Sequence, residues 1–200
     1  MGGCGDAGAA VRDERRGVSV FWEERAKTTL EWIGKDKVVN HHQEVPYRVL
    51  ERQYSYDGAG QHAEDNGSEN MIIHGDNLEA LKALLPQYEG KVKCIYIDPP
   101  YNTGEEGWVY NDNVNDPKIK NWLGQVVGKE GEDLSRHDKW LCMMYPRLKL
   151  LYKLLANDGL IAVSINDHEL YNLGAIMNEI FGTSHRLACA PFRSEPSGGK

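Results

Sequence analysis

A carboxylate, two prolines and an aromatic ring follow one another directly in this chain, as Asp98-Pro99-Pro100-Tyr101. They come after the apolar run 92–97, whose residue types favour a β-strand. In an open α/β sheet, ligands bind in the crevice beyond the carboxyl ends of the strands. The sequence therefore predicts that this tetrapeptide lies at a reactive sheet edge.

The tetrapeptide offers two hydrogen-bond acceptors, which are the Asp98 carboxylate and the Pro99 carbonyl. Successive prolines restrict the backbone toward extended geometry and remove neighbouring N–H donors, so they fix the direction of that carbonyl. Two such acceptors can bind the two N–H groups of an amine, and a charge-assisted hydrogen bond contributes roughly 1.5 to 3 kcal/mol. Tyr101 adds an aromatic face for a planar ligand, although a half-buried loop aromatic is the alternative.

The region after residue 70 is predicted to alternate between strands and helices. The predicted strands are 71–74, 92–97 and 160–165, and the predicted helices are 76–85, 138–156 and 168–181. This β-α-β-α-β order predicts an α/β fold with a parallel sheet, right-handed crossovers and flanking helices. We expect Pro146 to kink or split its helix, residues 157–159 to form a turn, and Gly182 to end the last helix.

Three polar clusters would share one edge of this sheet, because the carboxyl ends of parallel strands meet there. They are 75–76, Asp98 and 166–167. A simpler explanation exists for each of them. Asp98 precedes a proline, and Asp-Pro favours turns, but this explains too little of the tetrapeptide. Asp76, followed by Glu79, has the pattern of a helix cap, and Asn166 is typical of a turn.

Composition is ordinary for a soluble globular protein, with 200 residues, of which 40% are hydrophobic and 26% charged. No apolar stretch approaches a membrane span, and the N-terminus lacks a signal pattern, so we expect a cytoplasmic protein. The four cysteines are scattered, and the neighbouring His41 and His42 have no accompanying ligand set, so no metal site is predicted. A net charge of -7 gives no overall attraction to nucleic acid, so any DNA contact needs a local basic patch or a further segment.

Four regions are expected along the chain. Residues 1–20 form a loose extension, and 21–70 contain a helix over 21–32, an irregular segment and a polar linker over 57–70. Residues 71–182 carry the strands and helices described above, and 183–200 form an unpatterned tail.

Residues 97–104, read as Ile-Asp-Pro-Pro-Tyr-Asn-Thr-Gly, resemble the catalytic motif of DNA methyltransferases that modify an exocyclic amine. The upstream 75–78 and the helix and turn from Trp140 to Gly159 are similar to the same enzymes. Together with 32–35 and 110–112, the motif resembles the adenine-N6 enzymes of type III restriction-modification systems. The resemblance extends from about residue 21 to 182 and implies a partial Rossmann-like methyltransferase fold.

The resemblance implies S-adenosylmethionine as cofactor and a flipped adenine in DNA as substrate. Catalysis would rest on residues 98–101, and the base would contact Tyr101, Asn102 and Thr103. The cofactor-binding residues that it implies are Asp76, Asn77, Trp140 and Asn166. On general grounds, however, Trp140 and the neighbouring Met143 are more often core residues.

The resemblance also implies partners. Members of this group usually continue into a target-recognition region and a Phe-x-Gly-x-Gly loop, neither of which the 200 residues contain, so the sequence looks truncated. We therefore expect DNA, a restriction subunit or a complementary methyltransferase segment as partners, with homo-oligomerisation possible in principle. The alternatives are an inactive remnant or a non-catalytic DNA-binding or assembly module.

Overall fold

The computed structural model describes residues 29–103, 121, 124–125 and 135–192. The predicted extension 1–20, most of the predicted helix 21–32, and residues 110–112 of the motif lie outside the described residues. The described elements are α1 (Lys35–Val38), α2 (His41–Glu44), β1 (Ser55–Asp57), β2 (Gly60–His62), α3 (Asn77–Tyr88), β3 (Val92–Ile97), α5 (Arg136–Leu154), β4 (Leu155–Val163), α6 (Leu170–Phe181) and the short 3-10 helix η2 (Thr183–His185).

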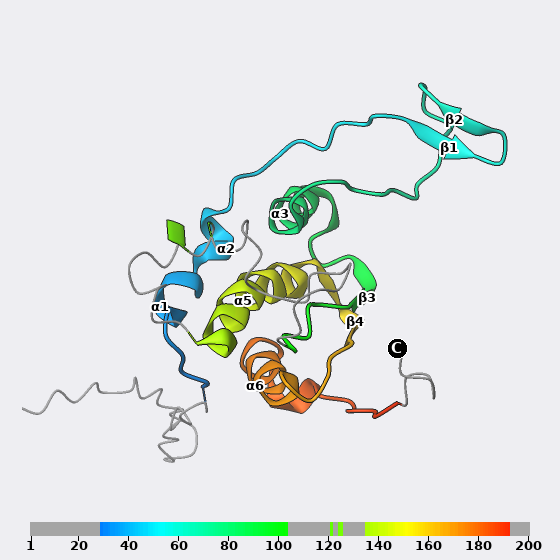
Figure 1. Ribbon diagram of the computed structural model, residues 1–200. Helices are drawn as coiled ribbons and strands as arrows, with labels where there is room; N and C mark the ends of the chain where they lie inside the picture. The colour runs from blue at the N-terminus through cyan, green and yellow to red at the C-terminus, as the bar shows by residue number, and fades with distance from the viewer. Residues whose placement is uncertain (1–28, 104–120, 122–123, 126–134, 193–200) are drawn as a thin grey trace, which may run out of the picture.

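A parallel pair of strands and one long helix form the centre of the fold. β3 pairs with β4 in the parallel direction, and Ile95 lies opposite Ile161 and Ile97 opposite Val163. α5 lies between α3 and α6 and contacts both (Figure 1). The structure thus confirms an α/β fold with a parallel sheet and flanking helices.

The core follows the apolar face of α5. Trp140 and Leu148 of α5 and Ile176 of α6 are fully buried, and Ile161 and Val163 of β4 pack against the same cluster. α5 is one helix of 19 residues that continues through Pro146, so the prediction that this proline splits the helix was wrong. Pro146 is itself buried in the core, where packing offsets the lost backbone hydrogen bond.

One predicted strand and one predicted turn were wrong. Residues 71–74 are not a strand, and the side chain of Ile72 is fully exposed, because within the described residues β3 pairs with β4 alone and offers this segment no ladder. The predicted turn at 157–159 lies inside β4 as a bulge. Between the pairs Val92–Leu155 and Cys94–Leu160, one residue of β3 faces four residues of β4.

The predicted linker contains an antiparallel hairpin. β1 pairs with β2, with Ser55 opposite His62, and Gly60, the first residue of β2, adopts a φ of 123° directly after the turn. Figure 1 shows this hairpin extending away from the helices at the end of two long irregular segments. Alternation was too weak over three-residue strands for the sequence to reveal it.

The segment 32–35 joins the first described residues to the core. Lys35 Nζ forms an ion pair with Glu179 of α6 at 3.0 Å and lies 5.0 Å from the centroid of the Trp32 ring. The Trp32 indole N–H donates to Cys142 Sγ at 3.4 Å, and Gly34 takes a φ of 88° that favours glycine. This part of the motif therefore has a structural role.

Within the described part of the chain, no helix is long and apolar enough to cross a membrane.

The bulge in β4 predicts opposite effects for two glycine substitutions. A Cβ at Gly159 would lie 2.8 Å from both Leu155 Cδ1 and the Val92 carbonyl, whereas the nearest atom to a Cβ at Gly174, inside α6, is 3.9 Å away. We expect Gly159→Ala to lower the free energy of unfolding by about 1 to 3 kcal/mol. The matched Gly174→Ala should raise it by about 0.5 to 1 kcal/mol. Urea unfolding measures both changes, and a neutral Gly159→Ala would contradict the bulge geometry.

His42 predicts acid sensitivity. Burial lowers the pKa of His42 to about 4 from the ordinary value of 6.5, and the charges of Lys149, Lys153 and Lys82 act in the same direction. Below pH 6.5 the unfolded chain therefore binds a proton that the folded chain excludes, so stability falls as the pH falls toward 4. We expect a loss of about 1 to 3 kcal/mol over that range, part of which His42→Gln should remove. Urea unfolding at several pH values tests this, and an unchanged pH dependence in the variant would contradict it.

Candidate active site

The predicted tetrapeptide lies where the sequence places it, directly after the last residue of β3. The neighbouring strand ends beside it, because the Ser164 amide donates to the Ile97 carbonyl at 3.0 Å. The segments that begin at Asp98 and Ser164 thus leave the same edge of the sheet. Asp98 is exposed there, and Pro99 and Pro100 are half-buried.

Asp98 and Tyr101 contact each other within the loop. The Tyr101 hydroxyl donates to Asp98 Oδ1 at 2.7 Å. This hydrogen bond, aided by partial burial, raises the pKa of Tyr101 to about 12, so the phenol stays protonated at neutral pH. Asp98 Oδ2 has no hydrogen bond within the described residues. One carboxylate oxygen therefore orients the tyrosine, and the other can accept a hydrogen bond from a ligand.

The two proline carbonyls differ in their partners. The Trp140 indole N–H donates to the Pro100 carbonyl at 2.7 Å, and the Trp140 side chain is fully buried. The Pro99 carbonyl has no hydrogen-bond partner in the part of the chain that the structure describes, which leaves it available to a ligand. Trp140 thus fixes the loop from the core, while its predicted contact with a cofactor stays a prediction.

Asn102 is a buried residue of the loop. It has a φ of 58°, and its amide Nδ2 donates to the Arg136 carbonyl at 3.3 Å and to Glu169 Oε1. Thr103, the other residue predicted to contact the base, is half-buried. Glu169 was not predicted from the sequence, and the one signal that pointed to it is its place in the first turn of the predicted helix 168–181.

The predicted cofactor residues Asp76 and Asn77 begin α3. Asp76 Oδ1 accepts from the amides of Leu78 and Glu79 at 2.9 and 3.1 Å, which confirms the helix cap. The Glu79 carboxylate accepts from Arg48 at 3.0 Å, so the side-chain half of the predicted capping box is not formed. Asn77 Oδ1 accepts from Nε of Arg147 at 2.8 Å, which places this helix start against the middle of α5.

Asn166 forms the turn that the simpler explanation expected. Its Oδ1 accepts from the His168 amide at 3.1 Å, and its carbonyl lies 3.4 Å from the Glu169 amide. The structure thus brings the turn at Asn166 and the Asp98 loop to one sheet edge. It does not place Asp76 there through a strand, because the segment before Asp76 is not part of the sheet.

Residues 92–189 match the model of the family described as DNA methylase. The chain is 37% identical to the type III restriction-modification enzyme EcoPI Mod subunit of Escherichia phage P1, over 82% of this chain and 26% of that protein. It is 38% identical to the StyLTI Mod subunit of Salmonella typhimurium, over 76% of this chain and 24% of that protein. It is 36% identical to the type II methyltransferase M.KpnI of Klebsiella pneumoniae, over 59% of this chain and 25% of that protein. The chain thus spans about a quarter of the length of these relatives.

Proposed function

The chain belongs to the DNA methylase family, and we propose that it carries the catalytic part of a site-specific methyltransferase acting on the adenine N6 amine in a restriction-modification system. The observation that carries this proposal is the pair of acceptors at the end of β3. Asp98 Oδ2 and the Pro99 carbonyl lack partners in the described region, beside a tyrosine that Asp98 orients. Such a pair suits a substrate with two N–H groups.

The proposed reaction transfers a methyl group to a weak nucleophile. The lone pair of an exocyclic amine is delocalised into the base, and hydrogen bonds from both N–H groups to Asp98 and the Pro99 carbonyl favour the pyramidal amine that can attack. A methyl sulfonium donor would supply the methyl group and leave as a neutral thioether once the new N–C bond replaces its C–S bond. The proton lost by the methylated nitrogen would leave to solvent through the hydrogen bond to the Asp98 carboxylate. Because positive charge develops on the nitrogen, the bond to the Asp98 carboxylate strengthens in the transition state, which accelerates transfer.

Tyr101 would bind the flipped base. An adenine that has left the duplex loses its stacking, and an aromatic side chain offers a replacement worth about 1 to 3 kcal/mol. The hydrogen bond from the Tyr101 hydroxyl to Asp98 holds the ring beside the carboxylate. The stacking surface and the acceptor would then belong to one loop.

S-adenosylmethionine is the proposed methyl donor, and it supplies a methyl group on a positively charged sulfur. The described residues fit a cationic cofactor with hydroxyl groups, because Asp76 and Asp98 are exposed carboxylates and the nearby Arg147 is engaged by Asn77 and by the Met143 carbonyl at 2.6 Å. Asp76, Asn77 and Asn166 would hold the cofactor. Trp140 would hold the loop in place from the core, through its hydrogen bond to the Pro100 carbonyl.

The exposed face of the sheet supports a partner segment. Parallel sheets normally bury both faces. Here Ile95 and Ile161 face the core, but Tyr96 and Leu160 on the opposite face are 66% and 48% exposed. We propose that a complementary methyltransferase segment covers this face. The same segment would supply further DNA contacts, because a chain with a net charge of -7 does not attract DNA overall. We also propose that the protein works with a restriction subunit, that it can associate with a second copy of itself, and that it is located in the cytoplasm.

The proposed cofactor site is tested by calorimetric titration of the 200-residue chain with S-adenosylhomocysteine, once circular dichroism shows that it is folded. We expect binding, and we expect Asp76→Ser to weaken it by about tenfold. Serine preserves the helix cap but removes the carboxylate, so the variant separates the two roles of Asp76. Binding by wild type with an unchanged affinity in Asp76→Ser would restrict Asp76 to the cap. A folded chain that shows no binding would contradict a cofactor site within these residues.

A further inference from the structure

The loop that carries Asp98 is attached to the protein body through Asn102. Asn102 has a φ of 58°, a conformation that asparagine tolerates better than other residues with a Cβ, and its side chain is fully buried. Its Nδ2 donates both to the Arg136 carbonyl and to Glu169 Oε1, whereas its Oδ1 has no partner within the described residues. The side-chain amide therefore depends on two acceptors, one from each flanking helix.

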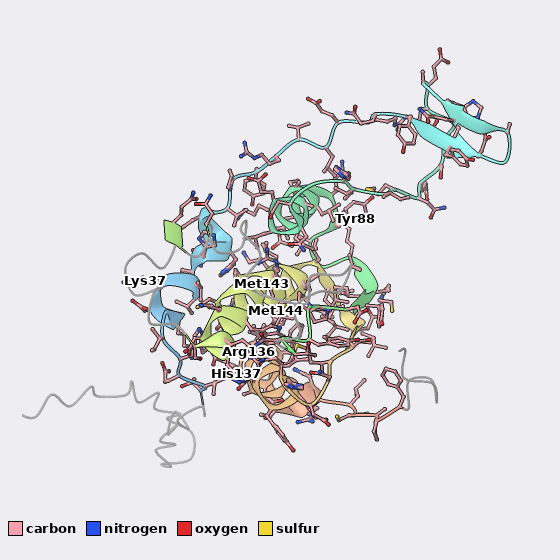
Figure 2. All side chains as sticks on the ribbon, viewed as in Figure 1. Lys37, Tyr88, Arg136, His137, Met143 and Met144 are labelled. Atoms are coloured by element: carbon pink, nitrogen blue, oxygen red, sulfur yellow. The ribbon has the colours of Figure 1, made fainter. Side chains whose placement is uncertain are left out.

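Glu169 is a buried carboxylate with three side-chain partners. It is fully buried at the start of α6, and besides Asn102 it contacts Nδ1 of His137 at 2.7 Å and accepts from Nδ2 of Asn172 at 2.8 Å. Burial of a carboxylate is costly unless hydrogen bonds satisfy its oxygens. His137 lies at the end of α5 that is next to α6 (Figure 2). Glu169 thus joins the ends of two helices to one residue of the loop.

We propose that Glu169 is a positioning residue for methyl transfer, which holds the loop 98–102 in its working geometry through Asn102. The inference rests on the proposed function. Hydrogen bonds hold the loop on both sides of Tyr101. The Trp140 indole donates to the Pro100 carbonyl before it, and Asn102 after it donates to Glu169 and to the Arg136 carbonyl. Losing the Glu169 acceptor leaves Asn102 with only the 3.3 Å hydrogen bond to the Arg136 carbonyl, which loosens the end of the loop that follows Tyr101. A displacement of about 1 Å in a reacting group can cost about 100-fold in rate.

Four variants separate positioning from folding. Glu169→Ala removes the side-chain acceptor of Asn102, and Glu169→Gln retains one oxygen that can accept. Asn102→Gly accepts the positive φ but makes no side-chain contact. Asn172→Ala is the matched control, because it removes a different hydrogen bond to the same carboxylate and leaves the loop contact in place.

The first readout is spectroscopic and needs no activity. A single 3-fluorotyrosine at position 101 of the 200-residue chain reports on the loop by ¹⁹F NMR. We expect one narrow resonance in the parent chain and in Asn172→Ala, and a shifted or broadened resonance in Glu169→Ala and Asn102→Gly. The second readout is methyl transfer to DNA in the presence of the complementary segment. Here we expect kcat to fall about 10- to 100-fold in the same two variants, with KM for the methyl donor within about twofold and with recovery in Glu169→Gln.

The inference is overturned if Glu169→Ala and Asn172→Ala give the same resonance and the same kcat, because Glu169 would then only stabilise the fold. If Glu169→Ala does not fold, Asn102→Gly decides: a parent-like resonance and kcat in that variant overturn the inference. If the resonances change as expected but the parent chain transfers no methyl group, the proposed function fails, while the contact between Glu169 and the loop is supported.

Discussion

Asp98→Ala is expected to lower kcat for methyl transfer by about 100- to 1,000-fold while leaving the fold intact. The carboxylate accepts from the amine as positive charge develops, so its loss removes an interaction that is strongest in the transition state. Asp98 is exposed, and its one described hydrogen bond is to Tyr101, so the free energy of unfolding should change by about 0.5 kcal/mol or less. The measurement is incorporation of tritiated methyl groups into DNA by the chain mixed with the complementary segment.

Two further variants sharpen this test. Asp98→Asn retains an acceptor without the charge and should fall between wild type and Asp98→Ala. Tyr101→Phe keeps the aromatic face but loses the hydroxyl that contacts Asp98, so we expect a loss of tenfold or less. A rate for Asp98→Ala equal to that of wild type would remove this residue from the mechanism.

Trp140→Ala is expected to have the largest effect on stability. The side chain is fully buried in the second turn of α5, and its truncation should lower the free energy of unfolding by about 3 to 5 kcal/mol, as observed for large core aromatics. Trp140→Phe fills most of the space but cannot donate to the Pro100 carbonyl, so it should cost about 1 to 2 kcal/mol plus the volume that is lost. Urea unfolding followed by circular dichroism measures both variants.

The phenylalanine variant also tests the loop attachment. If the Trp140 hydrogen bond fixes the Pro100 carbonyl, a fluorotyrosine at position 101 should change its resonance in Trp140→Phe even where most molecules remain folded. An unchanged resonance together with a large loss of stability would restrict Trp140 to core packing.

The sequence predicted the parts of the site that depend on local patterns. The apolar run 92–97 predicted β3 and thus the position of Asp98, and the Asp76 cap predicted the start of α3. The apolar spacing along 138–156 and the glycine at 182 predicted α5 and the end of α6. In each case the residues that determine the element are close neighbours in the sequence. A short stretch of sequence is therefore enough to predict the element.

The contacts that hold the loop could not be predicted in this way. The Trp140 indole reaches back 40 residues to the Pro100 carbonyl, and Glu169 reaches back 67 residues to Asn102. The same limit explains the error at 71–74, where apolar residues with β-propensity favoured a strand but the described structure offers no neighbour to pair with. The bulge at 157–159 was misread because a turn sequence within a strand carries the same local signal as a chain reversal.

Asp76 shows how both explanations of a residue can survive. The structure confirms the helix cap through Oδ1, yet the residue remains exposed beside the start of α3, with its second carboxylate oxygen outside any described hydrogen bond. A cap and a ligand contact can therefore use different oxygens of one carboxylate. The serine variant described above separates them, because serine retains the cap alone.

The most direct test of the account identifies the methylated product. The chain and its complementary segment are incubated with DNA and methyl-labelled S-adenosylmethionine, and the DNA is then digested to nucleosides and separated. We predict label in N6-methyldeoxyadenosine for the wild-type chain and its loss in Asp98→Ala. Label in a cytosine derivative instead would contradict the assignment of adenine. Equal label with Asp98→Ala would contradict the central claim, that the loop after β3 performs the transfer.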